Sequence, residues 1–159
     1  MAKALTVNLD KCTGCRSCEL ACSFKHHREF NPVKSNIHVS IFTENAFYVP
    51  VVCFQCDKAF CAEVCPTGAI SAGEANGAYV VTVDKGKCVG CKMCTLACPF
   101  GVITYQSEGH VQKCDLCGGE PECVTFCVPG ALEFKEETAA TLKKTRVLAE
   151  KIYRQKEVS

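Results

Sequence analysis

The chain has 159 residues, a formal net charge of +1 and 16 cysteines. Its length suits one compact unit or two small ones, and its balanced charge lacks the basic excess typical of nucleic-acid-binding domains. The longest apolar run, 47–54, contains Pro50 and is far shorter than the roughly 20 apolar residues of a membrane span. We therefore expect a protein that binds no nucleic acid and does not cross a membrane.

The N-terminal segment gives an expectation about location. The first cysteine is Cys12, which leaves no room before it for the charged, apolar and cleavage regions of a secretory signal. No twin-arginine pair opens the sequence. We expect a cytoplasmic protein, because thiols stay reduced in the cytoplasm and clustered cysteines there usually bind metal.

Short β-rich runs alternate with cysteine-rich segments along the chain. Strands that form short hairpins are expected at 5–9, 37–42, 47–52, 79–83 and 102–105. Loops are expected at 23–36 and 71–78, where polar and small residues dominate.

The C-terminal segment 135–159 differs in composition, because 136–155 contains no glycine, proline or cysteine. Its apolar residues fall on one stripe at helical spacing, which predicts an amphipathic helix. Two interpretations remain open for this helix. It either covers the core of its own chain or docks on a partner or a second copy.

The cysteines fall into four groups of four with none left over. The groups are Cys12, Cys15, Cys18 and Cys22; Cys53, Cys56, Cys61 and Cys65; Cys88, Cys91, Cys94 and Cys98; and Cys114, Cys117, Cys123 and Cys127. The first and third groups share the spacing C-x2-C-x2-C-x3-C, which is typical of bacterial ferredoxins, and the other two have longer middle spacers. A helical turn is expected after the third cysteine of each group. Four thiolates per group suit four [4Fe–4S] clusters.

Residues around the groups favour cluster loops over other uses of cysteine. Gly14 and Gly90 lie inside the two strict groups, where a residue without Cβ lets the backbone turn tightly around a cluster. Structural zinc is the main alternative, but zinc does not require the third cysteine that follows immediately in the first and third groups. No cysteine is left for a catalytic thiol, and the four histidines are expected to be surface or packing residues.

Three groups end in a similar way. Cys65 and Cys98 are each followed directly by a proline, Cys127 is followed by Pro129, and a glycine lies three residues after each of the three cysteines. Proline stops a helix and glycine permits a reversal into a strand. Cys22 lacks both residues, so its helix is free to continue.

The four groups, in this order, resemble the four-cluster electron-transfer subunits of the dimethyl-sulfoxide-reductase iron–sulfur type. Within that family, the sequence CTGCRSCELACSF at 12–24 and FNP at 30–32 are most similar to the small subunits of tungsten aldehyde oxidoreductases and tungsten benzoyl-CoA reductases. The five-residue spacer between Cys117 and Cys123 is short for many members of the family, and the displaced Pro129 departs from its pattern.

The resemblance implies an α+β fold of two nested bacterial-ferredoxin-like dicluster units. These units would occupy 1–134, with short β-hairpins, and the C-terminal helix would follow at 135–159. The outer unit would come from groups 12–22 and 114–127, and the inner unit from groups 53–65 and 88–98. The implied ligand sets are Cys12, Cys15, Cys18 and Cys127; Cys22, Cys114, Cys117 and Cys123; Cys53, Cys56, Cys61 and Cys98; and Cys65, Cys88, Cys91 and Cys94.

The resemblance also implies a non-catalytic electron-transfer subunit of anaerobic metabolism. Its partners would be a large catalytic subunit with a tungsten or molybdenum cofactor, such as an aldehyde oxidoreductase, and a flavin or other redox subunit. Three alternatives remain open. The first is a relay subunit of a hydrogenase, a formate dehydrogenase or a carbon monoxide dehydrogenase. The second is a structural or maturation subunit, or a filament-forming subunit whose C-terminal helix links copies, and the third is a freely diffusing ferredoxin with no fixed partner.

Overall fold

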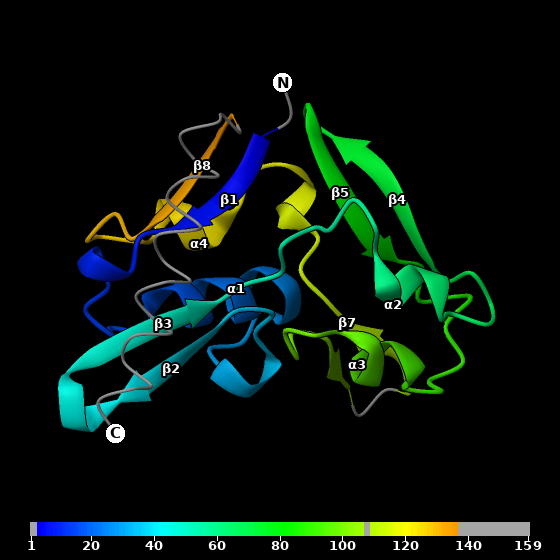
Figure 1. Ribbon diagram of the computed structural model, residues 1–159, viewed down its shortest axis with the longest axis horizontal. Coiled ribbons are helices and arrows are strands. Elements are labelled where there is room, and N and C mark those ends of the chain that lie inside the picture. The colour runs from blue at the N-terminus through cyan, green and yellow to red at the C-terminus, as the bar shows by residue number, and fades with distance from the viewer. Residues whose placement is uncertain (1–2, 107–108, 137–159) are drawn as a thin grey trace.

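The structure is a computed structural model that describes residues 3–106 and 109–136 (Figure 1). Small helices and two-stranded antiparallel sheets make up this part of the chain. The strands are β1 (Lys3–Val7), β2 (His38–Phe42), β3 (Phe47–Val51), β4 (Ile70–Ala75), β5 (Ala78–Val83), β6 (Thr104–Tyr105), β7 (Val111–Gln112) and β8 (Leu132–Glu136). The α-helices are α1 (Ser17–His27), α2 (Phe60–Glu63), α3 (Met93–Ala97) and α4 (Glu122–Thr125), and 3-10 helices cover Leu9–Lys11, Pro32–Lys34, Thr43–Asn45 and Leu116–Gly118.

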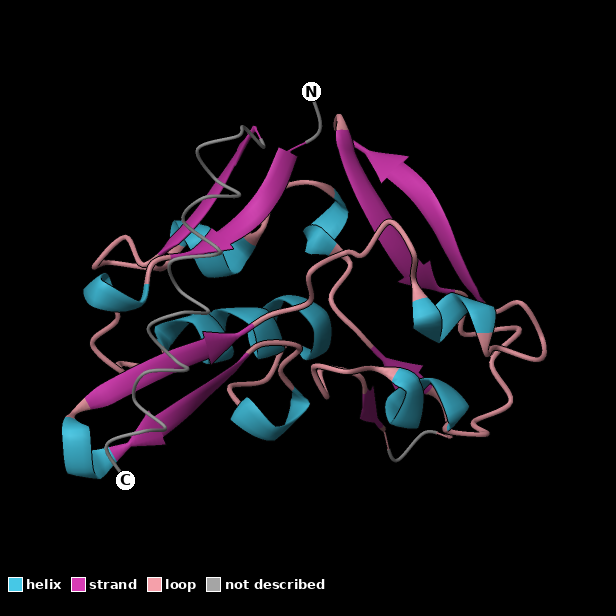
Figure 2. Ribbon diagram, in the orientation of Figure 1, coloured by secondary structure: helices cyan, strands magenta, loops and turns pink. Residues whose placement is uncertain are grey.

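Strand pairing joins the two ends of the described chain. β1 pairs with β8, with Lys3 opposite Glu136 and Val7 opposite Leu132, while the other sheets are the pairs β2–β3, β4–β5 and β6–β7. Figures 1 and 2 show β1, β8, α1, α4 and the β2–β3 hairpin in one half, and β4, β5, α2, α3 and β7 in the other. The first and last segments of the chain therefore form one half, and the middle segment forms the other.

The five expected strands are present with small shifts of their ends, but the loop expected at 71–78 is wrong. Most of that segment belongs to the β4–β5 hairpin. Asn76 and Gly77 form its two-residue turn with φ of +49° and +75°, which is the backbone conformation that an Asn-Gly hairpin favours. β4 is a poor strand by composition, with Gly73 and Glu74, so its pairing with the apolar β5 determines its conformation.

A helical turn surrounds the third cysteine of every group, and α1 continues well beyond Cys22 to His27. The loop expected at 23–36 is therefore wrong over its first residues. Nothing in that stretch interrupts the helix until Arg28, whose left-handed φ of +57° lets its N–H bond to the Phe24 carbonyl at 2.9 Å.

Three groups of buried apolar residues form the core, and cysteines belong to two of them. The first contains Cys18, Cys22, Ile37, Val52, Cys123 and Leu132, the second Ile70, Val81, Cys94, Ile103 and Val111, and the third Ala78, Val80 and Leu116. The third joins the halves, because Leu5 of β1 and Phe134 of β8 pack against it. Thiols thus occupy positions that aliphatic side chains fill in most small cores.

The expected C-terminal helix lies almost wholly outside the described residues. Lys135 and Glu136, its first two positions, belong to β8. Among the described residues, no helix has the length and apolar character needed to cross a membrane.

Candidate metal centres

The cysteines line four separate hollows, each of which receives four of them. Site I contains Cys12, Cys15, Cys18 and Cys127; site II contains Cys22, Cys114, Cys117 and Cys123; site III contains Cys53, Cys56, Cys61 and Cys98; and site IV contains Cys65, Cys88, Cys91 and Cys94. All sixteen thiols are free of disulfides. The family resemblance implies the same sets of four.

Each hollow takes three cysteines from one group and the fourth from a different group. In the first group, a single helix spans both sites. Cys18 and Cys22 are one turn apart on α1, yet Cys18 lines site I and Cys22 lines site II. Contacts of α1 with α4, and of α2 with α3, bring the exchanging groups together.

Two glycines shape the loops of sites I and IV. Gly14 and Gly90 have φ of +69° and +67°, a region that other residues adopt at a cost. A Cβ on Gly14 would lie 2.4 Å from the ring of Tyr48, and one on Gly90 would lie 2.3 Å from the Gly109 carbonyl oxygen. The expectation that these loops need glycine is confirmed, and close packing is a second reason for it.

The last cysteine of three groups accepts backbone hydrogen bonds at sulfur. The N–H of Asn36 donates to Cys22 Sγ at 3.3 Å, and that of Ala69 donates to Cys65 Sγ at 3.3 Å. Cys127 Sγ accepts from the N–H of Ala131 at 3.2 Å. Such bonds stabilise negative charge on a thiolate that holds a metal.

The displaced Pro129 does not change the turn after Cys127. Gly130 N–H donates to the Cys127 carbonyl at 2.9 Å, just as Gly68 and Gly101 donate to the carbonyls of Cys65 and Cys98 at 3.2 Å. The turn therefore depends on the glycine three residues after the cysteine, which all three segments share.

Burial makes several of these thiols poor anions in the metal-free chain. It raises the pKa of Cys18 and of Cys114 to about 12 and that of Cys117 to about 11. The exposed Cys15 differs, because hydrogen bonds with Ser17 lower its pKa. Metal binding must displace protons from the buried thiols, and the positive charge of the metal provides the driving force.

An unpaired polar side chain in site II fits an occupant that accepts hydrogen bonds. Asn36 is only 2% exposed and lines the hollow, yet its amide nitrogen and oxygen have no partner among the described residues. A buried amide without partners costs about 1–3 kcal/mol. An iron–sulfur cluster, whose sulfurs accept hydrogen bonds, suits this hollow and its four thiolates.

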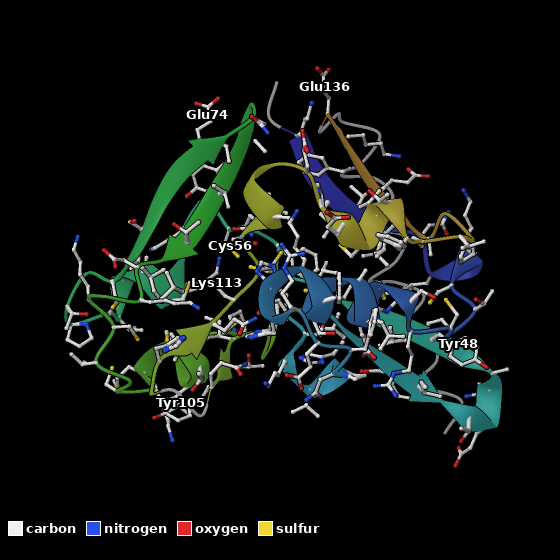
Figure 3. All side chains as sticks on the ribbon, turned by 180° about the vertical axis from the view of Figure 1, so that it is seen from behind. Tyr48, Cys56, Glu74, Tyr105, Lys113 and Glu136 are labelled. Atoms are coloured by element: carbon white, nitrogen blue, oxygen red, sulfur yellow. The ribbon has the colours of Figure 1, made fainter. Side chains whose placement is uncertain are left out.

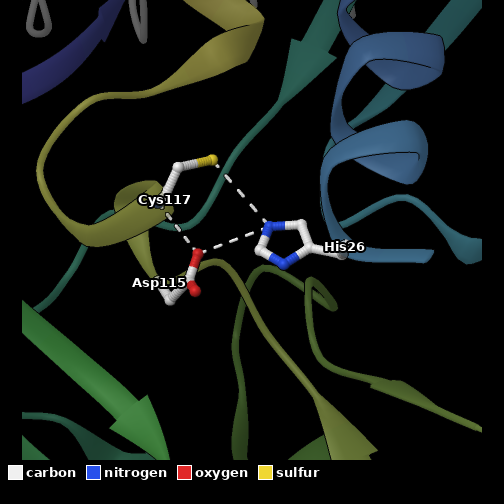
Figure 4. Close-up of side chains that lie close together, drawn as sticks. All are labelled: His26, Asp115 and Cys117. Carbon is white, nitrogen blue, oxygen red and sulfur yellow. Dashed lines mark hydrogen bonds and ion pairs between the residues drawn. The ribbon is translucent and has the colours of Figure 1, made fainter. Parts of the chain in front are cut away.

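A histidine contacts one of the site II cysteines (Figure 4). His26 Nε2 lies 3.8 Å from Cys117 Sγ and 3.4 Å from Asp115 Oδ1, and burial lowers its pKa. The expectation of a surface or packing role for His26 did not include this contact. Only the structure reveals it, because α1 and the loop of the fourth group are far apart in sequence.

Exposure of the cysteines differs between the four sites. Cys15 of site I and Cys91 of site IV are exposed, whereas every cysteine of sites II and III is buried or half-buried. Sites I and IV therefore present thiols to solvent.

Comparisons with known proteins agree with this geometry. Two models of 4Fe-4S dicluster domains match the chain, one over 44–137 and the other over 11–70. The polyferredoxin-like subunit of an aliphatic sulfonate oxidoreductase from Pyrococcus furiosus is 42% identical over 125 residues, which are 77% of this chain and 70% of that one. A subunit of anaerobic dimethyl sulfoxide reductase from Escherichia coli is 34% identical over 149 residues, which are 80% of this chain and 70% of that subunit.

A solved structure is also similar. The match is to BamBC, the active-site complex of benzoyl coenzyme A reductase, with a TM-score of 0.51 and 27% identity. It covers 96% of this chain and 90% of the matching one. This chain is thus a member of the 4Fe-4S dicluster domain family, similar to the iron–sulfur subunits of oxidoreductase complexes.

Proposed function

We propose that the chain carries four [4Fe–4S] clusters, one in each of sites I to IV, and relays electrons between a catalytic subunit and a second redox partner. The observation that carries the proposal is the set of four hollows, each lined by four cysteines. Sites I and II would form the outer dicluster unit, and sites III and IV the inner unit nested within it. Together these units would span residues 1–134.

The order of the sites supports a linear relay. α1 carries cysteines of both sites I and II, and the groups 53–65 and 88–98 exchange cysteines between sites III and IV. Sites II and III meet where the Gln55 side chain, in the wall of site III, donates to the carbonyl of Cys114 in site II. Electrons would enter or leave at the exposed ends, sites I and IV.

When bound, the clusters supply one-electron acceptors with potentials set by hydrogen bonds, charge and exposure. The residues of this chain would hold the clusters through thiolates and donate backbone N–H groups to sulfur. The rate of electron transfer falls steeply as the distance between carriers grows. Several short transfers between clusters in one small protein are therefore faster than a single transfer over the whole distance.

The proposed role is non-catalytic, because four thiolates would fill the ligand positions of each cluster and leave no iron open to substrate. The chemistry would occur on a large partner with a tungsten or molybdenum cofactor, most like a tungsten aldehyde oxidoreductase. The names of the relatives support such a partnership, since they are subunits of oxidoreductase complexes. A flavin or other redox subunit would serve as the second partner, and residues 135–159 would be a helix that docks a partner or a second copy.

An anaerobic reductive titration tests the relay. Each reduced chain should take up about four electrons, one for each cluster. In an affinity purification from its own cells, the chain should retain a large subunit that contains tungsten or molybdenum. A chain that takes up one or two electrons, or that is purified alone under anaerobic conditions, contradicts the proposal.

A further inference from the structure

Three of the four cysteine groups are preceded directly by a lysine. These are Lys11 before Cys12, Lys87 before Cys88, and Lys113 before Cys114. The side chains of Lys11 and Lys87 are 49% and 65% exposed and pair with carboxylates, those of Glu133 and Asp84. Lys113 differs, because only 5% of it is exposed.

Lys113 is held by neutral oxygen atoms alone. Its ammonium donates to the carbonyl of Val81, to Gln55 Oε1 at 3.3 Å and to the carbonyl of Cys114 at 3.2 Å. These three acceptors match the three N–H groups of an ammonium. Among the described residues, no carboxylate lies within ion-pair distance of it.

The side chain of Gln55 fixes this ammonium between sites II and III. Its Oε1 also accepts the N–H of Val81 at 2.9 Å, and its Nε2 donates to the Cys114 carbonyl at 2.8 Å. Gln55 and Lys113 both line site III, and Figure 3 shows Lys113 near Cys56 in the middle of the molecule. An ammonium buried without a carboxylate is costly, so a negative partner is expected nearby.

The cysteines of site III offer that partner. The ammonium of Lys113 and the thiols of Cys56 and Cys61 line the same hollow. A cluster held there by thiolates would bring negative charge close to the buried ammonium. Negative charge in site III is therefore attracted to Lys113.

We infer that Lys113, held in place by Gln55, is a positioning residue that compensates the charge of the cluster in site III and raises its reduction potential. The inference rests on the proposed function, since it requires a cluster in that hollow. One added electron makes a cluster more negative by one charge, and a fixed cation nearby stabilises that reduced state. The effect is strong there because buried charges are screened less than exposed ones.

Redox titration of the complete protein, followed by EPR, tests this inference. Lys113→Met should lower the reduction potential of the EPR component from site III by at least about 59 mV. This shift corresponds to a tenfold change in a one-electron equilibrium constant. Cys56→Ser identifies that component, because its spectrum should change when a site III ligand changes. Lys113→Arg keeps the charge and should keep the potential close to that of the unaltered protein.

Two variants provide matched controls. Lys11→Met and Lys87→Met remove a lysine at the same position relative to a cysteine group, but from exposed positions. Each control variant should change the one-electron reduction equilibrium of every cluster by less than about twofold, because exposed charges contribute little.

If Lys113→Met fails to incorporate clusters, a further variant tests the inference. In Gln55→Glu the new side chain has nearly the same shape as glutamine and places a carboxylate beside the ammonium of Lys113. This variant should therefore lower the reduction potential of the same site III component. The inference is wrong if fully loaded Lys113→Met, or Gln55→Glu, leaves the site III potential unchanged or shifts all components equally. Failure of the proposed function looks different, because the unaltered protein itself would then lack the site III component.

Discussion

The side-chain amide of Gln55 donates to the backbone carbonyl of Cys114 across 2.8 Å, although the two residues are 59 positions apart. Gln55 lies between Cys53 and Cys56 in a loop of site III and has a left-handed φ of +48°. Cys114 belongs to site II. The loops that line two sites thus contact each other directly, so the site walls themselves help to join the halves of the fold.

The crossed grouping of cysteines gives the first prediction. Cys127→Ser should alter the same EPR component as Cys15→Ser, since both cysteines line site I. Cys117→Ser is the control from site II, which receives three of its cysteines from the same group as Cys127. If Cys127→Ser instead alters the component that changes in Cys117→Ser, the fourth group does not exchange its last cysteine and the assignment is wrong.

Gly14 gives a stability prediction with a matched control. Gly14→Ala places a Cβ 2.4 Å from the ring of Tyr48 at a φ of +69°, whereas Gly68→Ala meets nothing within 4 Å at a similar φ of +62°. Both variants carry the left-handed cost of about 1–2 kcal/mol. The free energy of unfolding of Gly14→Ala should fall by about 1–3 kcal/mol more than that of Gly68→Ala, because the new Cβ overpacks against Tyr48.

Anaerobic thermal unfolding of the iron-loaded variants checks this difference. Tyr48→Ala combined with Gly14→Ala should recover the part of the loss that comes from the clash. An equal loss of stability in Gly14→Ala and Gly68→Ala would show that the contact with Tyr48 does not contribute to the cost of the Gly14 substitution.

The unpaired amide of Asn36 gives a prediction for site II. Asn36→Leu keeps the volume but removes a donor that faces the hollow. The potential of the site II component should fall by the equivalent of about 1 kcal/mol, since one hydrogen bond to the reduced cluster is lost. The exposed Asn45 provides the control variant Asn45→Leu, for which no shift is expected. An unchanged potential in Asn36→Leu would mean that the amide does not face a cluster.

Local sequence signals predicted the elements whose cause is local. The cysteine spacing predicted a helical turn in every group, and the β-branched runs predicted β2, β3 and β5. The β4–β5 hairpin was missed although Asn76-Gly77 is a strong turn signal. Its strand β4 is too small and polar to be recognised without its partner.

Other features depend on contacts that no local pattern contains. β1 pairs with β8, which lies more than a hundred residues later in the sequence, because both strands cover part of the common core. Lys113 and His26 look like ordinary polar residues in the sequence. Their significance comes from burial and from the loops that surround them, which only the folded chain defines.

Removal of iron should unfold the described part of the chain. Cys18, Cys22 and Cys123 belong to one core group and Cys94 to another, so cluster loss leaves buried thiols around vacated space. Chelation under reducing, anaerobic conditions should abolish the cooperative thermal transition and make the chain sensitive to protease. Retention of a cooperative transition in iron-free protein would show that the apolar core suffices by itself.

The most direct test of the four-cluster account is the iron and acid-labile sulfide content of anaerobically purified protein, measured together with its Mössbauer spectrum. Four clusters require about sixteen irons and about sixteen sulfides per chain, all in [4Fe–4S] form, and zinc should be negligible. Eight or fewer irons per chain, or zinc in place of iron, would contradict it.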